Sequence, residues 1–271
     1  MENRIDAKFA HLGTTGRTGF IAYITAGDPS LERTRQLVLS LERAGADFIE
    51  LGIPFSDPLA DGKTNQAAAE RALLNNVTLK QVIGLVREIR AETQIPIVFF
   101  TYLNPVFRYG FEAFARDAAA AGVDGVLALD QPPEEAAEFK NILDAHGLKT
   151  IFLIAPTSTE ERIKKITAQA SGFIYYVSRT GVTGERDTLS TDIGEHIAVI
   201  RRYSKLPIAV GFGVSTPDHV TRIASVADAV VVGSAIVHKV GDGGDADHMV
   251  ADVEQFVATL TAPLQTAAEG A

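Results

Sequence analysis

Three carboxylates surround the end of an apolar run in the stretch IELGIPFSDPLADG, residues 49–62. Glu50 stands within the run, where a carboxylate is costly unless it is paired or used in chemistry. Asp61 lies on the polar loop that follows, and Asp57 precedes a proline, where we expect a turn or an interface residue. A buried carboxyl with a raised pKa beside a more exposed, ionised one forms an acid/base pair for chemistry on a neutral or weakly basic group.

The position of Glu50 within its strand decides which way the side chain points. Alternation along ADFIELG puts Phe48, Glu50 and Gly52 on one face and Ile49 and Leu51 on the other. If the branched pair faces the surrounding helices, Glu50 points into the fold, and the loop bearing Asp61 is long enough to fold back over it. The alternatives are a salt bridge inside the fold for Glu50 and a common Asp-Gly turn for Asp61.

Two glycine-containing turns further along the chain have the features of a phosphate site. GFGVSTPDHV, residues 211–220, contains two glycines that permit close backbone approach, and a helix is expected to begin at 215–217. VVGSAIV, residues 231–237, contains Gly233 and then Ser234 at an expected N-cap. Helix N-termini and backbone amides favour phosphate, and barrels place such sites in the loops after strands seven and eight. The alternative is that these glycines only shape tight turns.

The elements that would position these groups alternate regularly along the chain. Short apolar runs rich in Val, Ile and Phe predict strands at residues 19–27, 47–53, 96–102, 125–130, 150–156, 172–178, 207–213 and 228–236. Apolar residues spaced three and four apart predict the intervening helices at residues 31–45, 79–92, 111–122, 133–147, 159–171, 192–204 and 217–226.

About eight such strand–helix units, with strands apolar on both faces, predict a single (β/α)8 TIM barrel spanning residues 1–271. Additional helices are expected at the N-terminus, after strand two (residues 66–74) and after strand eight (residues 234–240), and the tail at about 261–271 is expected to be frayed. A doubly wound open sheet is the alternative, but its usual glycine fingerprint is missing.

Composition narrows the class of partner. The net charge is −9 without a dense basic block, which argues against nucleic acid or an anionic membrane. Cysteine is absent, which excludes disulfides and thiolate chemistry, and the six histidines lack ligand spacing, so we expect no metal site. No apolar run is long enough to cross a bilayer, and the N-terminus lacks the order of a signal peptide, so we expect a cytoplasmic protein.

The chain resembles the tryptophan synthase alpha chain family. ELGIPFSDPLADG matches that family's signature, and TAGDP, TYLNPVFRYG, SRTGVTG, GFGVS and VGSAIV agree with it in order and spacing. The resemblance implies a (β/α)8 barrel that cleaves indole-3-glycerol phosphate to indole and glyceraldehyde 3-phosphate, a reversible retro-aldol reaction. It implies no cofactor in this chain, and transfer of indole to a pyridoxal-phosphate-bearing beta chain in an α2β2 heterotetramer.

The resemblance also implies roles for individual residues. Glu50 would be the general acid/base, and Asp61 would accept a hydrogen bond or proton from the indole nitrogen. The remaining assignments are substrate contacts at Tyr175, Thr183, Phe100 and Leu127, phosphate contacts at Gly184, Phe212, Gly213, Gly233 and Ser234, and partner contacts at Pro54, Asp57 and Pro132.

Three positions depart from the family's usual pattern. The family usually continues ADGPTIQ, whereas this chain reads ADGKTNQ, with Lys63 and Asn65 in place of proline and isoleucine. Gln131 stands where an aliphatic residue is usual. These positions are expected on the mouth and the partner-facing side, and the loss of proline should make the loop more mobile.

Two other functions stay open at this point. One is a catalytically weak partner whose main task is to bind and stimulate a beta chain, although both carboxylates favour an enzyme. The other is a different phosphate-binding barrel, such as a sugar-phosphate epimerase, which would need metal ligands or a symmetric carboxylate pair that the sequence does not offer.

Overall fold

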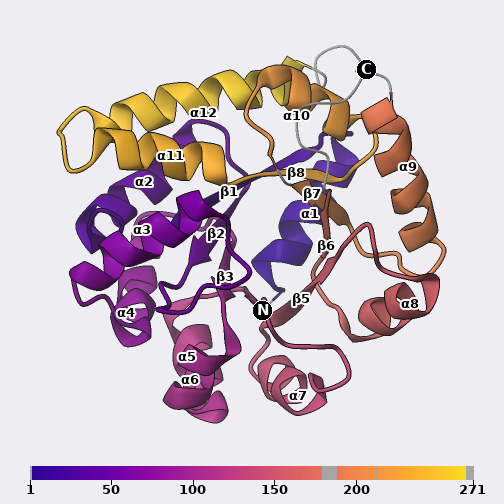
Figure 1. Ribbon diagram of the computed structural model, residues 1–271, viewed down its shortest axis with the longest axis horizontal. Helices are drawn as coiled ribbons and strands as arrows, with labels where there is room; N and C mark the ends of the chain where they lie inside the picture. The colour runs from indigo at the N-terminus through magenta and orange to yellow at the C-terminus, as the bar shows by residue number, and fades with distance from the viewer. Residues whose placement is uncertain (1, 179–187, 212, 267–271) are drawn as a thin grey trace.

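Eight parallel strands close into a barrel in the order β1 to β8, with β8 pairing back to β1, in the computed structural model (Figure 1). The structure describes residues 2–178, 188–211 and 213–266. The strands are β1 (Gly19–Thr25), β2 (Phe48–Gly52), β3 (Ile97–Thr101), β4 (Gly125–Ala128), β5 (Lys149–Ile154), β6 (Ile174–Val177), β7 (Ile208–Gly211) and β8 (Ala229–Val232). The expected (β/α)8 barrel is confirmed, and the open-sheet alternative is wrong.

Helices surround the barrel and close one of its ends. They are α1 (Arg4–Thr14), α2 (Leu31–Arg43), α3 (Lys63–Leu74), α4 (Leu79–Ile89), α5 (Leu103–Tyr109), α6 (Phe111–Ala121), α7 (Ala137–Ala145), α8 (Glu160–Gln169), α9 (Thr188–Arg201), α10 (Pro217–Ala224), α11 (Ser234–Gly243) and α12 (Met249–Thr266). The three additional helices expected from the sequence are α1, α3 and α11. The short helix α5 after β3 was not expected.

The C-terminal helix corrects one expectation. The segment after residue 261 does not fray at once, because α12 continues to Thr266 and Leu264 is buried. Leu260 and Leu264 stand four residues apart and continue the buried face of the helix. Residues 267–271 lie outside the described part of the chain. In the described residues, no helix is both long and apolar enough to span a membrane.

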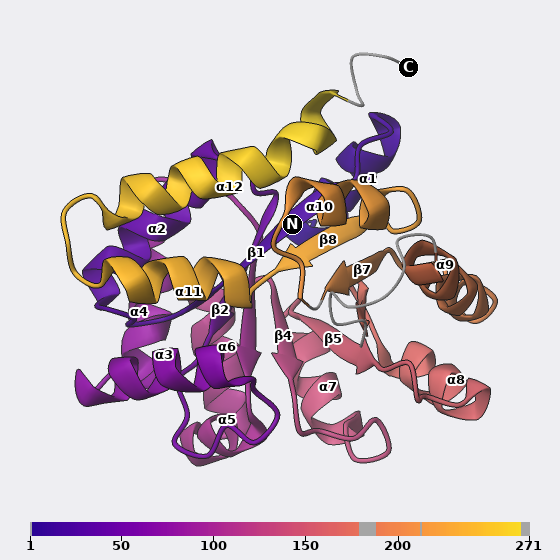
Figure 2. The ribbon, with the colours of Figure 1, turned by 45° about the horizontal axis from the view of Figure 1, so that its top comes forward.

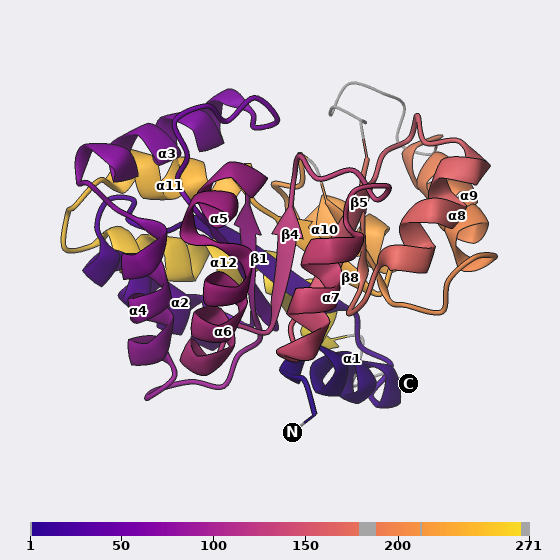
Figure 3. The ribbon, with the colours of Figure 1, turned by 90° about the horizontal axis from the view of Figure 1, so that it is seen from below.

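The barrel divides the core into an outer and an inner layer. Ile49 and Leu51 of β2 belong to the outer layer between strands and helices, whereas Phe48 belongs to the inner layer. The face assignment made from alternation is therefore confirmed. Phe9 of α1 stacks on Phe48 with ring centroids 4.5 Å apart, so α1 closes the end where the strands begin. Figure 3 shows α1 at the opposite end of the barrel from α3, which leaves the other end open as the mouth.

A repeated hydrogen bond ties neighbouring strands together where they begin, and we call these contacts the strand-pair clamps. In each, a polar side chain just before an even-numbered strand accepts a hydrogen bond from a backbone amide of the preceding strand. The four clamps are Asp47 to Phe20 at 3.0 Å, Asp124 to Ile97 at 2.8 Å, Ser171 to Thr150 at 2.8 Å, and Asp228 to Ile208 at 2.8 Å. The three aspartates are also paired with Arg17, Arg90 and Arg201 respectively.

The clamp at Asp124 yields a stability prediction. Its carboxylate also binds Arg90 and Arg4, each at 2.8 Å, and the Arg90 side chain is only 9% exposed. Asp124→Ala would leave the Ile97 amide without its acceptor and the buried Arg90 charge without its counter-charge, although Arg90 would keep its hydrogen bonds to the backbone oxygens of Gly122 and Ile95. We expect the free energy of unfolding, measured by denaturant titration, to fall by about 3–5 kcal/mol.

The matched control is Asp144→Ala, which removes an i,i+4 pair with Lys140 at the surface. That change should cost no more than about 0.5 kcal/mol. Equal losses in the two variants would contradict the assigned role of the clamp.

Candidate active site

A cavity of about 420 Å³ opens at the mouth of the barrel, where the strands end. Side chains from β1, β2, β3 and β6 form its base, and the start of α3 and the turns after β7 and β8 form its rim. The lining residues used below are Tyr23, Glu50, Asp61, Lys63, Asn65, Phe100, Leu129, Leu153, Tyr175, Gly213, Gly233 and Ser234. The two carboxylates expected to work together therefore share one cavity with three of the glycine and serine positions expected to bind phosphate.

Glu50 is fully buried in this cavity and lacks any hydrogen-bond partner among the described residues. The salt bridge considered from the sequence is absent from the same residues. Burial alone raises the pKa of Glu50 to about 8. A carboxyl of this kind carries a proton at neutral pH and can exchange it with a bound ligand.

The raised pKa of Glu50 makes stability depend on pH. The ordinary pKa of a glutamate is 4.5, and that of Glu50 in the folded chain is about 8. At a pH between these two values the unfolded chain has released the proton while the folded chain retains it, so the contribution of Glu50 to stability falls as pH rises. Glutamine cannot ionise, so we expect the free energy of unfolding of Glu50→Gln at pH 8 to exceed that of the parent by more than about 1 kcal/mol.

The difference between Glu50→Gln and the parent should shrink towards pH 5, and denaturant titrations at both pH values measure it. Glu70→Gln on the exposed face of α3 is the control and should show no such trend. A Glu50→Gln variant less stable than the parent at pH 8 would contradict the burial argument.

Asp61 reaches the cavity from the loop between β2 and α3. The Tyr102 hydroxyl donates a 2.9 Å hydrogen bond to Asp61 Oδ2 and accepts one from the Ala60 amide at 2.9 Å, so the loop is fastened to the end of β3. Burial raises the pKa of Asp61 as well, while hydrogen bonds from Tyr102 and Asn65 oppose the rise. Asp61 is partly buried and is therefore the more exposed of the two carboxyls, as the sequence predicted.

The phosphate end of the cavity combines a turn with a helix N-terminus. Gly213 has φ +69°, a conformation that disfavours any residue with a side chain. The N-cap of α11 is Gly233, one residue earlier than the Ser234 N-cap expected from the sequence, and Ser234 is the first residue of the helix. The first amides of α11 have no acceptor within the helix and favour an anion. Figure 2 shows α11 beside α3, and the two helices begin at the same cavity.

Two tyrosines and two glycines shape the base of the cavity. The Tyr175 hydroxyl lies 2.8 Å from where a Cβ on Gly211 would be, and the Tyr23 hydroxyl lies even closer to the corresponding point on Gly52. Gly211 therefore makes room for Tyr175, a reason that the sequence did not suggest. Tyr175 and Glu50 line the same cavity, and the pKa of Tyr175 is raised by burial and by nearby Glu50.

Tyr23, which lines the cavity, and Tyr102, which holds the Asp61 loop, were not named from the sequence. Tyr23 packs edge-on against Phe100 with centroids 5.0 Å apart, and its pKa is raised by burial, then by Asp61 and Glu50. An inward-facing polar aromatic residue in β1, and the tyrosine of TYLNP, were the available signals for Tyr23 and Tyr102.

Some expected residues lie elsewhere. Leu127 is 1% exposed and does not line the cavity, because it occupies the layer below, and Leu129, on the same face two residues later, lines the cavity instead. Thr183, Gly184 and Phe212 lie outside the described residues.

The three expected partner contacts differ in their exposure. Pro54 is buried and presents no surface for docking, whereas Asp57 is exposed and Pro132 is partly buried. Among the described residues, the most exposed large apolar side chains are Leu59 at 92%, Leu74 at 77% and Phe107 at 69%, and none of them was named from the sequence.

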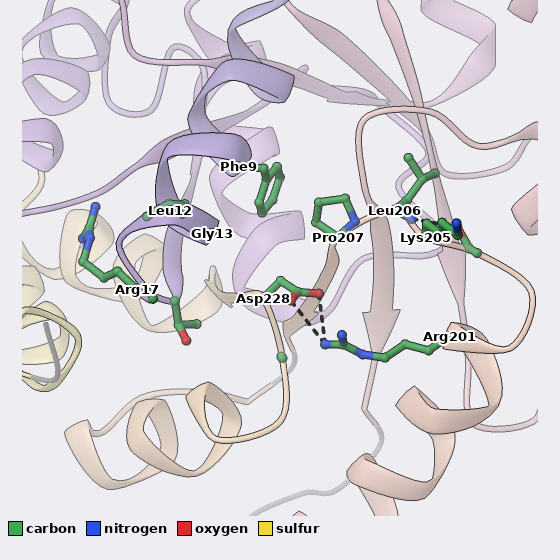
Figure 4. Close-up of a pocket in the computed structure, with 13 residues that line it drawn as sticks. Phe9, Leu12, Gly13, Arg17, Arg201, Lys205, Leu206, Pro207 and Asp228 are labelled. Carbon is green, nitrogen blue, oxygen red and sulfur yellow. Dashed lines mark hydrogen bonds and ion pairs between the residues drawn. The ribbon is translucent and has the colours of Figure 1, made fainter. Parts of the chain in front are cut away.

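A second cavity, of about 500 Å³, lies at the opposite end of the barrel beside α1 (Figure 4). Its guanidinium groups are already neutralised, because Arg201 binds Asp228 at 3.2 Å and Arg17 binds Asp47. These pairs belong to the strand-pair clamps, so this cavity borders structural contacts. No group of three or more His, Asp or Glu suited to a metal ion occurs among residues 2–178, 188–211 and 213–266.

A buried carboxyl suited to proton exchange at one end of the mouth cavity, and turn and helix amides suited to an anion at the other, are typical of (β/α)8 enzymes that act on a small phosphorylated molecule. Comparison with known proteins narrows this class to one family. A family model described as tryptophan synthase alpha chain matches residues 9–267. The chain belongs to the tryptophan synthase alpha chain family.

Individual relatives agree with this assignment. The chain is 54% identical over 236 residues to the tryptophan synthase alpha chain of Geotalea daltonii, covering 87% of this chain and 89% of that one. It is 50% identical over 258 residues to that of Geobacter sulfurreducens, covering 95% and 97%.

Solved structures of tryptophan synthase alpha chains have the same fold as this chain. The tryptophan synthase subunit alpha of Legionella pneumophila superposes with a TM-score of 0.91 at 35% identity, over 98% of this chain and 100% of that one. A chain from the tryptophan synthase α2β2 complex of Pyrococcus furiosus gives 0.84 at 40% identity, over 91% and 99%. Members of the family are lyases of tryptophan biosynthesis that need no cofactor of their own and cleave indole-3-glycerol phosphate, passing indole to a beta chain. The epimerase alternative is therefore wrong.

Proposed function

We propose that the mouth cavity cleaves indole-3-glycerol phosphate with Glu50 as the general acid/base and Asp61 as the partner of the indole nitrogen. The observation that carries this assignment is the fully buried, unpartnered Glu50 carboxyl, which shares its cavity with Asp61 and with the glycine turns. A buried carboxyl without a partner is unfavourable for folding, and it is suited to exchange protons with a ligand.

The proposed reaction balances with one proton that cycles through Glu50. The protonated carboxyl donates to the indole carbon that bears the glycerol chain, and the nitrogen lone pair of the ring stabilises the resulting cation. Asp61 accepts a hydrogen bond or proton from the ring nitrogen, which stabilises that cation. The glycerol hydroxyl then returns a proton to Glu50 as the carbon–carbon bond breaks, giving indole and glyceraldehyde 3-phosphate.

Substrate orientation follows from the two ends of the cavity. The phosphate would bind at Gly213, Gly233 and Ser234, which directs the indole towards Phe100, Leu129 and Leu153. Thr183, Gly184 and Phe212 stay predictions for the same pocket. Tyr175 lines the same cavity as Glu50 and stays a predicted substrate contact.

We propose that a beta chain carrying pyridoxal phosphate receives the indole in an α2β2 heterotetramer. The structural neighbour from the tryptophan synthase α2β2 complex of Pyrococcus furiosus supports a protein partner, and Leu59 and Phe107 are exposed apolar side chains that such a partner could cover. Asp57 and Pro132 stay predicted contacts on that surface. A cytoplasmic location also stays a prediction.

Measuring indole release from indole-3-glycerol phosphate, with and without a beta chain, tests this function. A cleavage rate that rises strongly on adding the beta chain is the expected result. Absence of indole release in both conditions would reject the lyase assignment and leave an activating partner, and full activity of the isolated chain would make it a free-standing indole producer.

A further inference from the structure

Lys63 is a charged residue of the mouth cavity that the proposed mechanism does not use. It is the first residue of α3, which begins earlier than the sequence predicted, and it lines the cavity. The family usually has a proline here, so this chain has a cation where a neutral side chain is usual. Among the described residues that line the cavity, Lys63 is the only basic one.

The charge of Lys63 has no structural role in the described part of the chain. The side chain is exposed and forms no ion pair there, and Asp61, two residues earlier, accepts its hydrogen bond from Tyr102 instead. A cation at a helix N-terminus opposes the helix dipole, and the first turn of α3 contains no acidic residue that would offset it. Lys63 therefore does not stabilise the helix that it begins, and its ammonium group is available to a ligand.

The packing of α3 on α11 decides which end of the cavity Lys63 faces (Figure 2). Ala68 of α3 and Val237 of α11 belong to one buried apolar cluster. Further along both helices, Arg71 Nη2 lies 3.0 Å from where a Cβ on Gly241 would be. Because these two contacts advance in the same direction along both helices, α3 and α11 run parallel, and their first turns are neighbours.

The parallel helices bring Lys63 to the end of the cavity that suits an anion. Gly233 and Ser234 begin α11 and line the cavity together with Lys63. The axes of packed helices are about 8–10 Å apart. A lysine has a flexible stem and three donors at its tip, so its ammonium group can reach an anion held at the start of the neighbouring helix. The same positive charge offsets that of Asp61, which would otherwise repel an anionic ligand.

We propose that Lys63 determines specificity for the phosphorylated substrate: its ammonium group contacts the phosphate of indole-3-glycerol phosphate from the α3 side, beside the first amides of α11. This role rests on the proposed function of the cavity. A hydrogen bond between an ammonium group and a phosphate is charge-assisted and therefore among the stronger ones. Because the phosphate does not take part in the carbon–carbon cleavage, the contact is the same in the ground state and in the transition state. It should therefore lower KM and leave kcat unchanged.

The kinetic test compares Lys63→Met, which keeps an unbranched side chain and removes the charge, with Lys63→Arg, which keeps the charge. In Lys63→Met we expect KM for indole-3-glycerol phosphate to rise by about 10-fold at low salt, with kcat within about twofold of the parent. Added salt should raise KM of the parent more steeply than that of Lys63→Met, because salt screens an exposed charge. Lys63→Arg should keep most of the affinity. Lys80→Met is the matched control, since Lys80 is exposed in the first turn of α4 and does not line the cavity, and it should match the parent.

A second measurement does not depend on turnover. Calorimetry compares a non-cleavable indole alkyl phosphate with the corresponding indole alkyl alcohol, which lacks the phosphate. Lys63→Met should bind the phosphate about 10-fold more weakly than the parent and the alcohol equally well, which also shows that the variant is folded. If the parent releases indole but Lys63→Met binds the phosphate as tightly as the parent, the role of Lys63 is overturned while the proposed function stands. If the parent releases no indole, the proposed function fails, and a selective loss of phosphate affinity in Lys63→Met would still support the contact.

Discussion

Glu50→Gln should reduce the turnover of indole-3-glycerol phosphate by about 10³-fold or more, because it removes the carboxyl that we assign to proton exchange at the base of the cavity. Glutamine keeps the size of the side chain and the apolar walls around it. Binding of a non-cleavable indole alkyl phosphate, measured by calorimetry, should therefore change little. The loss should appear in kcat and not in ligand affinity.

Two controls make the Glu50 experiment decisive. Glu70→Gln lies on the exposed face of α3 and should retain full turnover. The same Glu50→Gln protein should be more stable than the parent at pH 8, so a loss of activity cannot be attributed to unfolding. Turnover within about 10-fold of the parent would show that another group transfers the proton.

Asp61→Asn is the second substitution with a large expected effect. The amide can still accept a hydrogen bond from Tyr102, which lies 2.9 Å from Oδ2, so the loop should stay in place. It cannot supply the negative charge that stabilises a cationic ring nitrogen, and we expect turnover to fall by about 10²–10³-fold with little change in phosphate affinity.

Asp57→Asn, in the same loop, is the control for Asp61→Asn. It tests whether the loss of turnover comes from the missing charge at the cavity or from the loss of any charge on the loop. Asp57 is exposed, its carboxylate accepts a hydrogen bond from Ser56 at 2.9 Å, and it does not line the cavity. In assays without a beta chain it should behave like the parent. Similar losses in the two variants would mean that the loop needs its charges for folding, and that Asp61 has no special contact with the indole.

The sequence predicted those features that depend on local periodicity. Alternation along β2 placed Phe48 and Glu50 inside the barrel and Ile49 outside it, because a strand offers only two faces. The glycine turns after β7 and β8 were found because helix N-termini after the late strands of a barrel have a fixed location. The cavity then brings Glu50 and Gly233 together through closure of the barrel, which the strand count already implied.

Features that depend on depth or on distant contacts could not be predicted in this way. Leu127 and Leu129 share one face, and only the height of β4 in the barrel decides that Leu129 reaches the ligand. The bond between Tyr102 and Asp61 joins residues 41 positions apart, so no local pattern reveals it. The burial of Pro54 likewise follows from packing around the loop.

The strand-pair clamps have a consequence for how this enzyme can be altered. The three aspartates of the strand-pair clamps sit at the rim closed by α1, whereas both carboxyls assigned to chemistry sit at the other rim. The residues of the open rim can therefore be redesigned for new indole analogues, and can vary between species, without changing the strand-pair clamps at the opposite rim. Libraries confined to the residues around Glu50 should accordingly contain many folded, inactive proteins and few that fail to fold.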